Sequence, residues 1–197
     1  MNRTQARWPE IRQAGYADQA AIRDFLDALS LRARYLRFFT GALSASPSVL
    51  RVLAGGGDHI DAIVAVEDGV IIGHAMAADT PSSATEIGVV VTDACQGRGI
   101  GSALIRTLAA RARGRGITTA TMDVLTENRQ VLAMITDHWP AARHDVSGPC
   151  ATIRVPLPQP AGRPGDARGP ADTAREPEGH GTGRTEEHPR ERLAIPY

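Results

Sequence analysis

The glycine-rich stretch at residues 89–102 carries the clearest chemical signal in the sequence, and it reads VVVTDACQGRGIGS. Its three valines predict a strand, and the apolar spacing after Ser102 predicts an amphipathic helix. The first N–H groups of a helix have no partner within the helix, and the helix dipole favours negative charge beside them. We therefore expect the turn between this strand and this helix to bind an anion such as a phosphate group.

The glycines of this turn suit it to a ligand. Gly97, Gly99 and Gly101 leave the backbone bare, so that a phosphate can approach the N–H groups closely. The side chains of Arg98 and Ser102 are expected to add hydrogen-bond donors. The alternative is a glycine-rich connector that binds nothing.

Two common phosphate-binding motifs fit the turn poorly. A Walker A loop ends in Gly-Lys-Ser/Thr, and the sequence contains no lysine. The dinucleotide-binding fingerprint places a third glycine or alanine where Ser102 stands when it is counted from Gly97 and Gly99. That fingerprint also follows the first strand of its fold, whereas several predicted strands precede this turn. A nucleotide-dependent oxidoreductase is therefore a distant alternative.

Helical and strand-like periods alternate along the chain and predict one mixed sheet. We expect helices first, then an antiparallel meander with a hairpin turn at Asp68-Gly69, and then a strand-helix-strand crossover. This order predicts an α/β fold with a single mixed, mostly antiparallel sheet flanked by helices. The expected helices span 18–29, 31–39, 47–53, 102–113 and 128–138, and the expected strands span 62–67, 70–78, 85–91, 118–125 and 150–155.

The composition changes near Pro156. From there to Tyr197, eight of 42 residues are proline and six are glycine. Six arginines and seven acidic residues share this segment, so it is not a basic arm. Such a segment cannot bury enough apolar surface to offset the entropy lost on ordering it. We expect a folded domain at residues 5–156 and a disordered tail at residues 157–197.

Composition and charge exclude several classes of function. The 22 basic residues, all arginine, balance 22 acidic ones, which argues against nucleic acid as a partner. No apolar run approaches the ~20 residues of a membrane span, and Met1 to Glu10 lack the apolar stretch of a secretion signal. Cys95 and Cys150 are too few for a disulfide framework, and no His or Cys spacing indicates a metal site. We expect a soluble cytoplasmic protein without a bound metal or a membrane partner.

The pattern Gln96-x-x-Gly99-x-Gly101 resembles the acetyl-CoA motif of the GNAT acyltransferases, and the resemblance covers roughly residues 10–156. Residues 85–91 (TEIGVVV) look like the fourth strand of that family, which precedes its diphosphate-binding loop and helix. The segment 30–39 (SLRARYLRFF) is similar to an early helical segment of bacterial Pat-type protein lysine acetyltransferases. The resemblance implies the GNAT fold and transfer of an acetyl group from acetyl-CoA directly to an amine, without a covalent enzyme intermediate.

The resemblance also assigns cofactor-binding roles by position. The strand residues Val89, Val90 and Val91 would lie along the pantetheine arm, with the backbone groups of the first and third pairing with it as if it were an added strand. One of these amides would polarise the thioester carbonyl. Asn128 would contact the cofactor near its thiol. The diphosphate would be held by the backbone amides of Gln96, Gly97, Arg98, Gly99, Ile100, Gly101 and Ser102.

Glu86 is the candidate general base, because similar family members carry a glutamate ten residues before the glutamine. An amine such as lysine, with a reference pKa of about 10.4, is protonated at neutral pH, and its neutral form costs roughly 4–5 kcal/mol. A carboxylate with an ordinary pKa is a weak base, so we expect burial to raise the pKa of Glu86. The alternative is a glutamate on a half-solvated strand face without a catalytic role.

The sequence departs from the family pattern at the position of the general acid. Many members carry a tyrosine seven residues after the asparagine, and Ile135 stands there in this chain. We therefore assign no general acid. The acceptor is an amine, with a protein lysine slightly favoured over a small amine because of segment 30–39. A non-catalytic module that binds acyl-CoA and signals through a partner is the alternative from another class.

Overall fold

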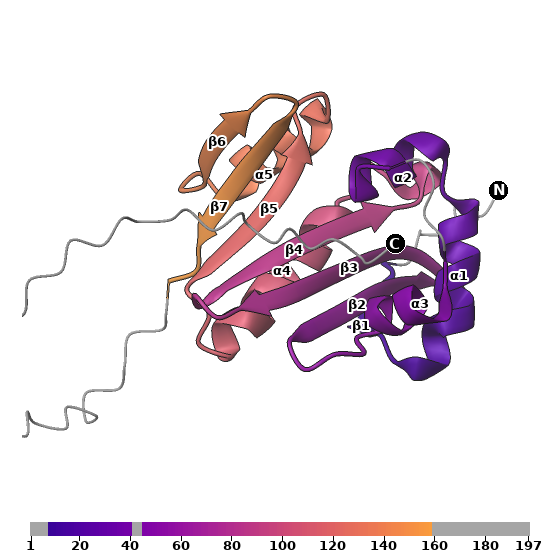
Figure 1. Ribbon diagram of the computed structural model, residues 1–197. Helices are drawn as coiled ribbons and strands as arrows, with labels where there is room; N and C mark the ends of the chain where they lie inside the picture. Colours follow the sequence, from indigo (N-terminus) through magenta and orange to yellow (C-terminus); the bar gives the residue numbers. More distant parts are fainter. Residues whose placement is uncertain (1–7, 41–44, 159–197) are drawn as a thin grey trace, which may run out of the picture.

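The computed structural model describes residues 8–40 and 45–158, and its centre is one seven-stranded sheet (Figure 1). The strand order is β1-β2-β3-β4-β5-β7-β6. Only β4 and β5 run parallel; the other neighbouring pairs are antiparallel. The strands are β1 (Glu10–Gln13), β2 (Ile60–Glu67), β3 (Val70–Thr80), β4 (Ala84–Val91), β5 (Thr119–Leu125), β6 (Arg143–Ser147) and β7 (Cys150–Pro156). The predicted α/β fold with a mixed, mostly antiparallel sheet is confirmed.

Side-chain caps set the start of several helices. Ser30 accepts a hydrogen bond from the Ala33 amide (3.1 Å), and Ser46 one from the Val49 amide (3.4 Å), so that α2 and α3 begin directly after them. The helices are α1 (Gln19–Ala28), α2 (Leu31–Phe38), α3 (Pro47–Leu53), α4 (Ile100–Gly114) and α5 (Arg129–His138), with short 3₁₀ turns at η1 (Tyr16–Asp18) and η2 (Asp93–Cys95). Each predicted helix is present, within about two residues of its expected ends.

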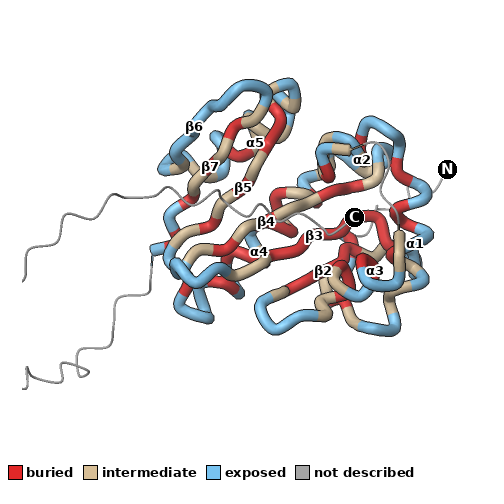
Figure 2. The backbone as a smooth tube through the Cα atoms, in the orientation of Figure 1, coloured by how far each residue is buried: buried red, intermediate tan, exposed pale blue. Residues whose placement is uncertain are grey.

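Helices cover both faces of the sheet and divide the core into two layers. On one face α4 and α5 pack over β2 to β5 and β7, through buried residues such as Leu104, Leu108 and Ile135. On the other face α1, α2 and α3 pack over β2 to β4, through residues such as Ile22 and Leu53. Figure 2 shows the buried residues concentrated in the central strands, whereas β6 is exposed along its length.

The parallel pair β4 and β5 separates part-way along the sheet. The two strands are paired only at Ala84–Thr119, Thr85–Ala120 and Glu86–Thr121. Beyond Glu86, β4 continues to Val91 paired with β3, while β5 continues to Leu125 paired with β7. The sheet therefore splits after Glu86, and the two strands diverge in Figure 1.

The ends of the domain differ in detail from the expectation. Leu157, assigned to the tail by composition, is only 7% exposed, and its amide donates to the Thr118 carbonyl (2.8 Å). Its burial extends the folded domain by at least this residue. Residues 159–197 of the predicted tail and residues 5–7 lie outside the described residues. No helix within the described ranges is long and apolar enough to cross a membrane.

Candidate active site

The turn between β4 and α4 presents a series of unused backbone donors. The first hydrogen bond into the helix is donated by the Ala103 amide to the Gly99 carbonyl (3.1 Å). Within the described part of the chain, the amides of residues 97–102 donate no backbone hydrogen bond. These amides lie at the positive end of the fifteen-residue helix α4, so they can hold a negatively charged group.

Two of the glycines in this turn are required by the backbone. Gly97 has φ +73° and Gly99 has φ +81°, a left-handed conformation that side chains disfavour. Gly101 is already helical, and a Cβ there would first meet Val91 Cγ2 at 3.9 Å. Gly101 has no side chain, which keeps the amino-terminal end of α4 open. It does not relieve backbone strain.

Gln96 and Ser102 use side-chain groups to shape the turn. The Gln96 amide nitrogen donates to the Val91 carbonyl (3.1 Å), and its backbone amide donates to the Asp93 carbonyl (3.3 Å). The buried Ser102 hydroxyl donates to the Gly99 carbonyl (2.8 Å). Both side chains thus brace the turn internally, and the Ser102 hydroxyl proton is directed to the protein rather than to a ligand.

The Arg98 side chain is directed away from the turn. Its guanidinium makes two hydrogen bonds to the Glu67 carboxylate at the end of β2, at 2.9 and 2.5 Å. This hydrogen-bonded pairing raises the pKa of Arg98 and lowers that of Glu67. The Arg98 side chain was expected to add a hydrogen-bond donor at the turn. A bidentate ion pair with Glu67 holds its guanidinium elsewhere, so residue 98 offers its backbone amide at the turn.

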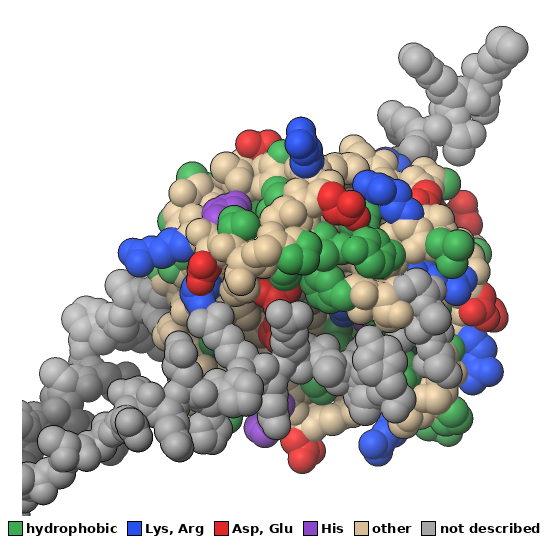
Figure 3. Space-filling view, turned by 45° about the horizontal axis from the view of Figure 1, so that its top comes forward, with side chains coloured by type: hydrophobic (Ala, Val, Ile, Leu, Met, Phe, Trp, Pro, Cys, Tyr) green, Lys and Arg blue, Asp and Glu red, His purple; other side chains and the backbone are tan. Residues whose placement is uncertain are grey.

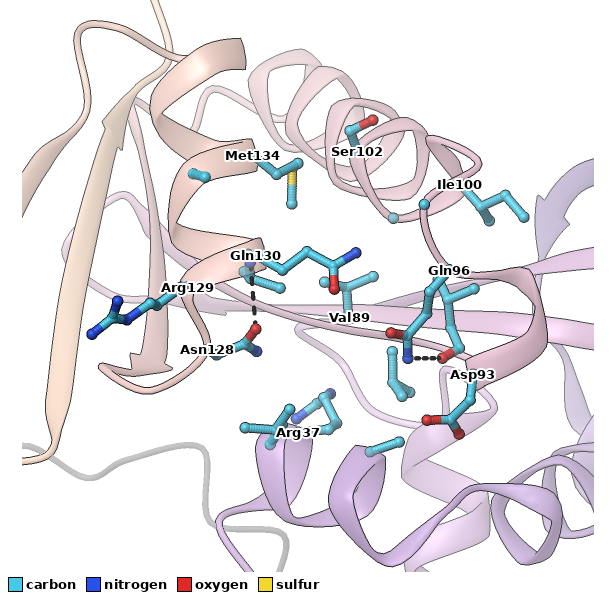
Figure 4. A pocket seen from close by; sticks show the side chains of 18 of the residues that line it. Arg37, Val89, Asp93, Gln96, Ile100, Ser102, Asn128, Arg129, Gln130 and Met134 are labelled. Atoms are coloured by element: carbon cyan, nitrogen blue, oxygen red, sulfur yellow. Dashed lines mark hydrogen bonds between the residues drawn. The ribbon is translucent and has the colours of Figure 1, made fainter.

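A cavity of about 740 Å³ joins this turn to the split in the sheet. Every residue predicted to bind the cofactor lines it except Arg98, and the remaining walls come from α2 and α5. Figure 4 shows Gln130 extended across the cavity towards Val89, whereas Arg129 points away from it. In the face seen in Figure 3, arginines and acidic side chains are interspersed around hydrophobic ones, without one dominant charge.

The three valines of β4 contribute differently to this cavity. The Thr92 amide donates to the Ile72 carbonyl of β3 (2.9 Å), so even-numbered β4 residues turn their peptide groups to β3 and odd-numbered ones turn theirs to β5. The peptide groups of Val89 and Val91 therefore face the split, although the Val91 carbonyl already accepts from Gln96. Val90 turns its peptide groups to β3 and is only 7% exposed.

Ile100 and Asn128 complete the predicted set. Ile100 is 1% exposed and belongs to the core, so its amide is what it presents to the cavity. The Asn128 side-chain oxygen accepts from the Val131 amide (3.3 Å) and caps α5. Its amide nitrogen lies on the cavity side (Figure 4).

Glu86 lies at the point where β4 and β5 part, and it is the last β4 residue paired with β5. Its side chain is half-buried on the sheet face that carries α2, and it is not part of the cavity lining itself. Arg37, which lines the cavity, interacts electrostatically with Glu86. The predicted base thus stands beside the cavity and not within its wall.

The model of the acetyltransferase (GNAT) family matches residues 29–137, more than half of the chain. The chain belongs to the GNAT acetyltransferase family. The match includes β4, the glycine turn and α4, which the sequence motif had singled out. No curated protein sequence matches the chain.

Solved structures share this GNAT fold at low sequence identity. The GNAT domain of PAT from S. lividans is 23% identical and has a TM-score of 0.67, over 75% of this chain and 89% of that one. A phosphinothricin acetyltransferase from Sinorhizobium meliloti, solved with acetyl-CoA, is 18% identical with a TM-score of 0.64, over 82% and 95%. A ribosomal-protein-alanine N-acetyltransferase from Brucella melitensis is 18% identical with a TM-score of 0.61, over 75% and 99%. The names of these proteins point to different acceptors on one fold.

Arg37 and Gln130 are among the polar cavity residues that sequence reasoning about this GNAT chain missed. Arg37 follows the buried Ala33 by four positions, so helical periodicity places both on the same side of α2. That signal was available in the sequence, although it does not reveal which strand the arginine meets. Gln130 lies in the first turn of α5, and only the packing of that helix aims it across the cavity.

The remaining polar candidates are His74, Cys95 and any group of side chains that could hold a metal ion. His74 is 2% exposed, and its Nε2 donates to the Leu53 carbonyl (2.8 Å), which is a structural role. Burial lowers its pKa to about 4. Cys95 lines the cavity, with its sulfur 3.6 Å from an Arg98 nitrogen. Within the described residues, no group of three or more His, Cys, Asp or Glu is arranged to hold a metal ion.

Proposed function

We propose that this GNAT protein transfers an acetyl group from acetyl-CoA directly to an amine, with a protein lysine as the favoured acceptor. The observation that carries the proposal is the continuous cavity from the unused amides of residues 97–102 to the split between β4 and β5. One end suits a diphosphate, and the other offers an unpaired strand edge to an extended, amide-containing chain.

The described residues fit acetyl-CoA as a co-substrate. The diphosphate would accept hydrogen bonds from the amides of residues 97–102, next to the left-handed Gly97 and Gly99. The pantetheine arm would lie along the β4 edge, where the peptide groups of Val89 face the split. The Val91 carbonyl already accepts a hydrogen bond from Gln96. The Val91 N–H would remain as a donor to the thioester oxygen.

Glu86 would take the proton that the acceptor must lose. The neutral amine nitrogen attacks the thioester carbonyl carbon, the carbon–sulfur bond breaks, and the thiolate of CoA leaves. The amine proton passes to the Glu86 carboxylate, directly or through one water, and the thiolate takes a proton from solvent. Ile135 occupies the position of the family's tyrosine, so the scheme includes no protein acid for the thiolate.

The preference for a protein lysine rests on the resemblance of segment 30–39 to Pat-type enzymes. In the structure this segment contains the cap Ser30 and helix α2, which forms one wall of the cavity. The segment is therefore placed where an acceptor would approach. The fold itself does not select among acceptors, because those sites are built from variable elements.

Binding and turnover separate the proposal from its rivals. Calorimetry should show that acetyl-CoA binds and NAD does not, and thiol release should follow with at least one member of a panel of lysine peptides and small amines. Binding without thiol release from any acceptor would favour a non-catalytic acyl-CoA-binding module. Stabilisation by NAD rather than by CoA would favour an oxidoreductase.

The Glu86→Gln variant tests the proposed base on the best acceptor from that panel. We expect kcat to fall by about 100-fold or more, since a positioned general base contributes on that order. Glu10→Gln, on the exposed edge strand β1, is the matched control and should leave kcat unchanged. Equal turnover of the Glu86→Gln variant and the wild type across pH would remove Glu86 from the mechanism.

A further inference from the structure

Arg37 is held in a seat formed by a glycine and an aromatic ring. An ideal Cβ built on Gly88 would lie 2.3 Å from the Arg37 Cζ, so the guanidinium occupies the space that this glycine leaves open. The same Cζ lies 4.8 Å from the centre of the Phe38 ring. The Arg37 Nε is shielded from solvent and has no hydrogen-bond partner. Backbone on β4 and a ring on α2 therefore fix the position of this cation.

The seat places Arg37 beside the proposed base. Gly88 and Glu86 are two residues apart on β4, so they share one face of the sheet. By strand register, that face of the sheet also carries His74 of β3, Asp123 of β5, Arg154 of β7, Arg143 and Asp145 of β6, and Glu10 and Arg12 of β1, and helix α2 over it carries Arg32 and Arg34. His74 donates to Leu53, and Asp123 accepts from Thr152. Arg37 is a cation that interacts electrostatically with Glu86.

We propose that Arg37 is a positioning residue, which holds Glu86 ionised and directed to the acceptor side of the split in the sheet. The inference rests on the proposed function, because it concerns the base of that reaction. Opposite charges in a partly desolvated site stabilise each other's ionised forms. Gly88 is part of the device, because any side chain there would push the guanidinium away from β4.

Arg37 changes the charge state that is expected of the Glu86 carboxyl group. The sequence predicts that burial disfavours its charge, whereas the neighbouring cation favours it. A carboxylate that is already ionised attracts a protonated amine into the split and can accept its proton. Arg37 lines the cavity and Glu86 stands beside it, so the pair presents one fixed polar edge to the acceptor.

The direct test is a titration of the Glu86 carboxyl group by ¹³C NMR in the full chain, which requires neither acceptor nor turnover. Glu86→Gln assigns the signal. In Arg37→Gln the midpoint should rise by about one pH unit or more, since the cation that interacts electrostatically with Glu86 is lost. Arg37→Lys, which keeps the charge, should remain closer to the wild type than Arg37→Gln does.

Gly88→Ala tests the seat without changing any charge. It should also raise the Glu86 midpoint, and adding it to Arg37→Gln should have little further effect. Gly114→Ala is the matched control, because a Cβ there meets nothing within 4 Å. It should leave the midpoint where it is. Amide NMR spectra confirm that each variant is folded, and Gly88→Ala with Arg37→Lys carries the test should Arg37→Gln fail to fold.

The outcomes distinguish this inference from the proposed function. A Glu86 midpoint that is unchanged in both Arg37→Gln and Gly88→Ala overturns the inference, even if Glu86→Gln is inactive. A fully active Glu86→Gln overturns the proposed base, even if the midpoint shifts. Where turnover is measurable, the acidic limb of kcat/KM should move with the NMR midpoint in Arg37→Gln, which a purely structural role for Arg37 would not produce.

Discussion

Two ionisable side chains lie within the layer between the sheet and helices α1 to α3. His74 is satisfied by one backbone carbonyl, and Arg37 by a glycine seat, a ring and the charge of Glu86. Burial lowers the pKa of Arg37 to about 10 and that of His74 to about 4. At neutral pH the arginine therefore stays charged and the histidine neutral.

The lowered pKa of His74 predicts a loss of stability in mild acid. Because the folded-state pKa is about 4 and the unfolded value is 6.5, the unfolded chain binds the proton first as the pH falls. The His74 contribution is complete above pH 6.5 and is lost between about 6.5 and 4, with a total of roughly 3 kcal/mol.

Urea unfolding at about pH 7 and about pH 4.5 measures this loss in the wild type and in His74→Gln. Glutamine can still donate to the Leu53 carbonyl but does not titrate, so the variant should lose less free energy of unfolding between the two pH values. An identical pH dependence in both proteins would show that His74 does not contribute to it.

At the scale of elements, the same backbone conformation serves two purposes. Gly69 in the hairpin between β2 and β3 has φ +80°, and Gly97 in the turn before α4 has φ +73°. A Cβ at either position meets nothing within 4 Å. The first glycine only reverses the chain, whereas the second exposes amides at the start of a helix. A comparison of substitutions at Gly69 and Gly97 therefore distinguishes the cost of a left-handed backbone from the function of the turn before α4.

Gly97→Ala and Gly69→Ala should each lower the free energy of unfolding by about 1 kcal/mol, because alanine disfavours a left-handed backbone. Only Gly97→Ala should also weaken acetyl-CoA binding, by about fivefold if the loop relaxes by a conformational change of that energy. Calorimetric titration of both variants checks this. Equal affinity in the two variants would indicate that the turn does not hold the diphosphate.

Elements with strong local signals were predicted well, and elements without them were missed. The predicted helices at 31–39 and 47–53 are present as α2 and α3, and the Asp68-Gly69 turn paired β2 with β3 as expected. The strands β1 and β6 were not predicted. Both are short edge strands, β6 is exposed throughout, and neither shows the apolar alternation of a half-buried strand. They exist because a neighbouring strand offers them hydrogen bonds.

At the scale of the whole molecule, the sheet is joined by a short parallel contact at its centre. The crossover through α4 requires β4 and β5 to run parallel, and β7 then pairs with the far side of β5. An ion-pair network links α4 back to the sheet: Asp61 of β2 bonds Arg111 and Arg115 at 2.7 and 2.9 Å. The split thus forms between two halves that are each paired on their outer side.

The absence of lysine from the whole chain predicts that the protein does not modify its own side-chain amines. After incubation with acetyl-CoA, peptide mass spectrometry should find acetyl groups only at the amino terminus. Chemical acetylation of an Arg106→Lys variant verifies that an acetyl-lysine would be detected. Acetylation at internal positions, for example on the Cys95 thiol, would contradict the prediction and indicate a reactive nucleophile near the cofactor turn.

The sequence by itself determined the helices, most strands, the glycine turn and the family, because these depend on periodicity, caps and backbone freedom over a few neighbouring residues. Only the tertiary structure decided which groups meet. It turned Arg98 to Glu67 and away from the ligand turn, closed Gln96 onto Val91, and brought Arg37 against Gly88. Such contacts join residues from different elements, so they follow from the packing of the two layers and not from any local pattern.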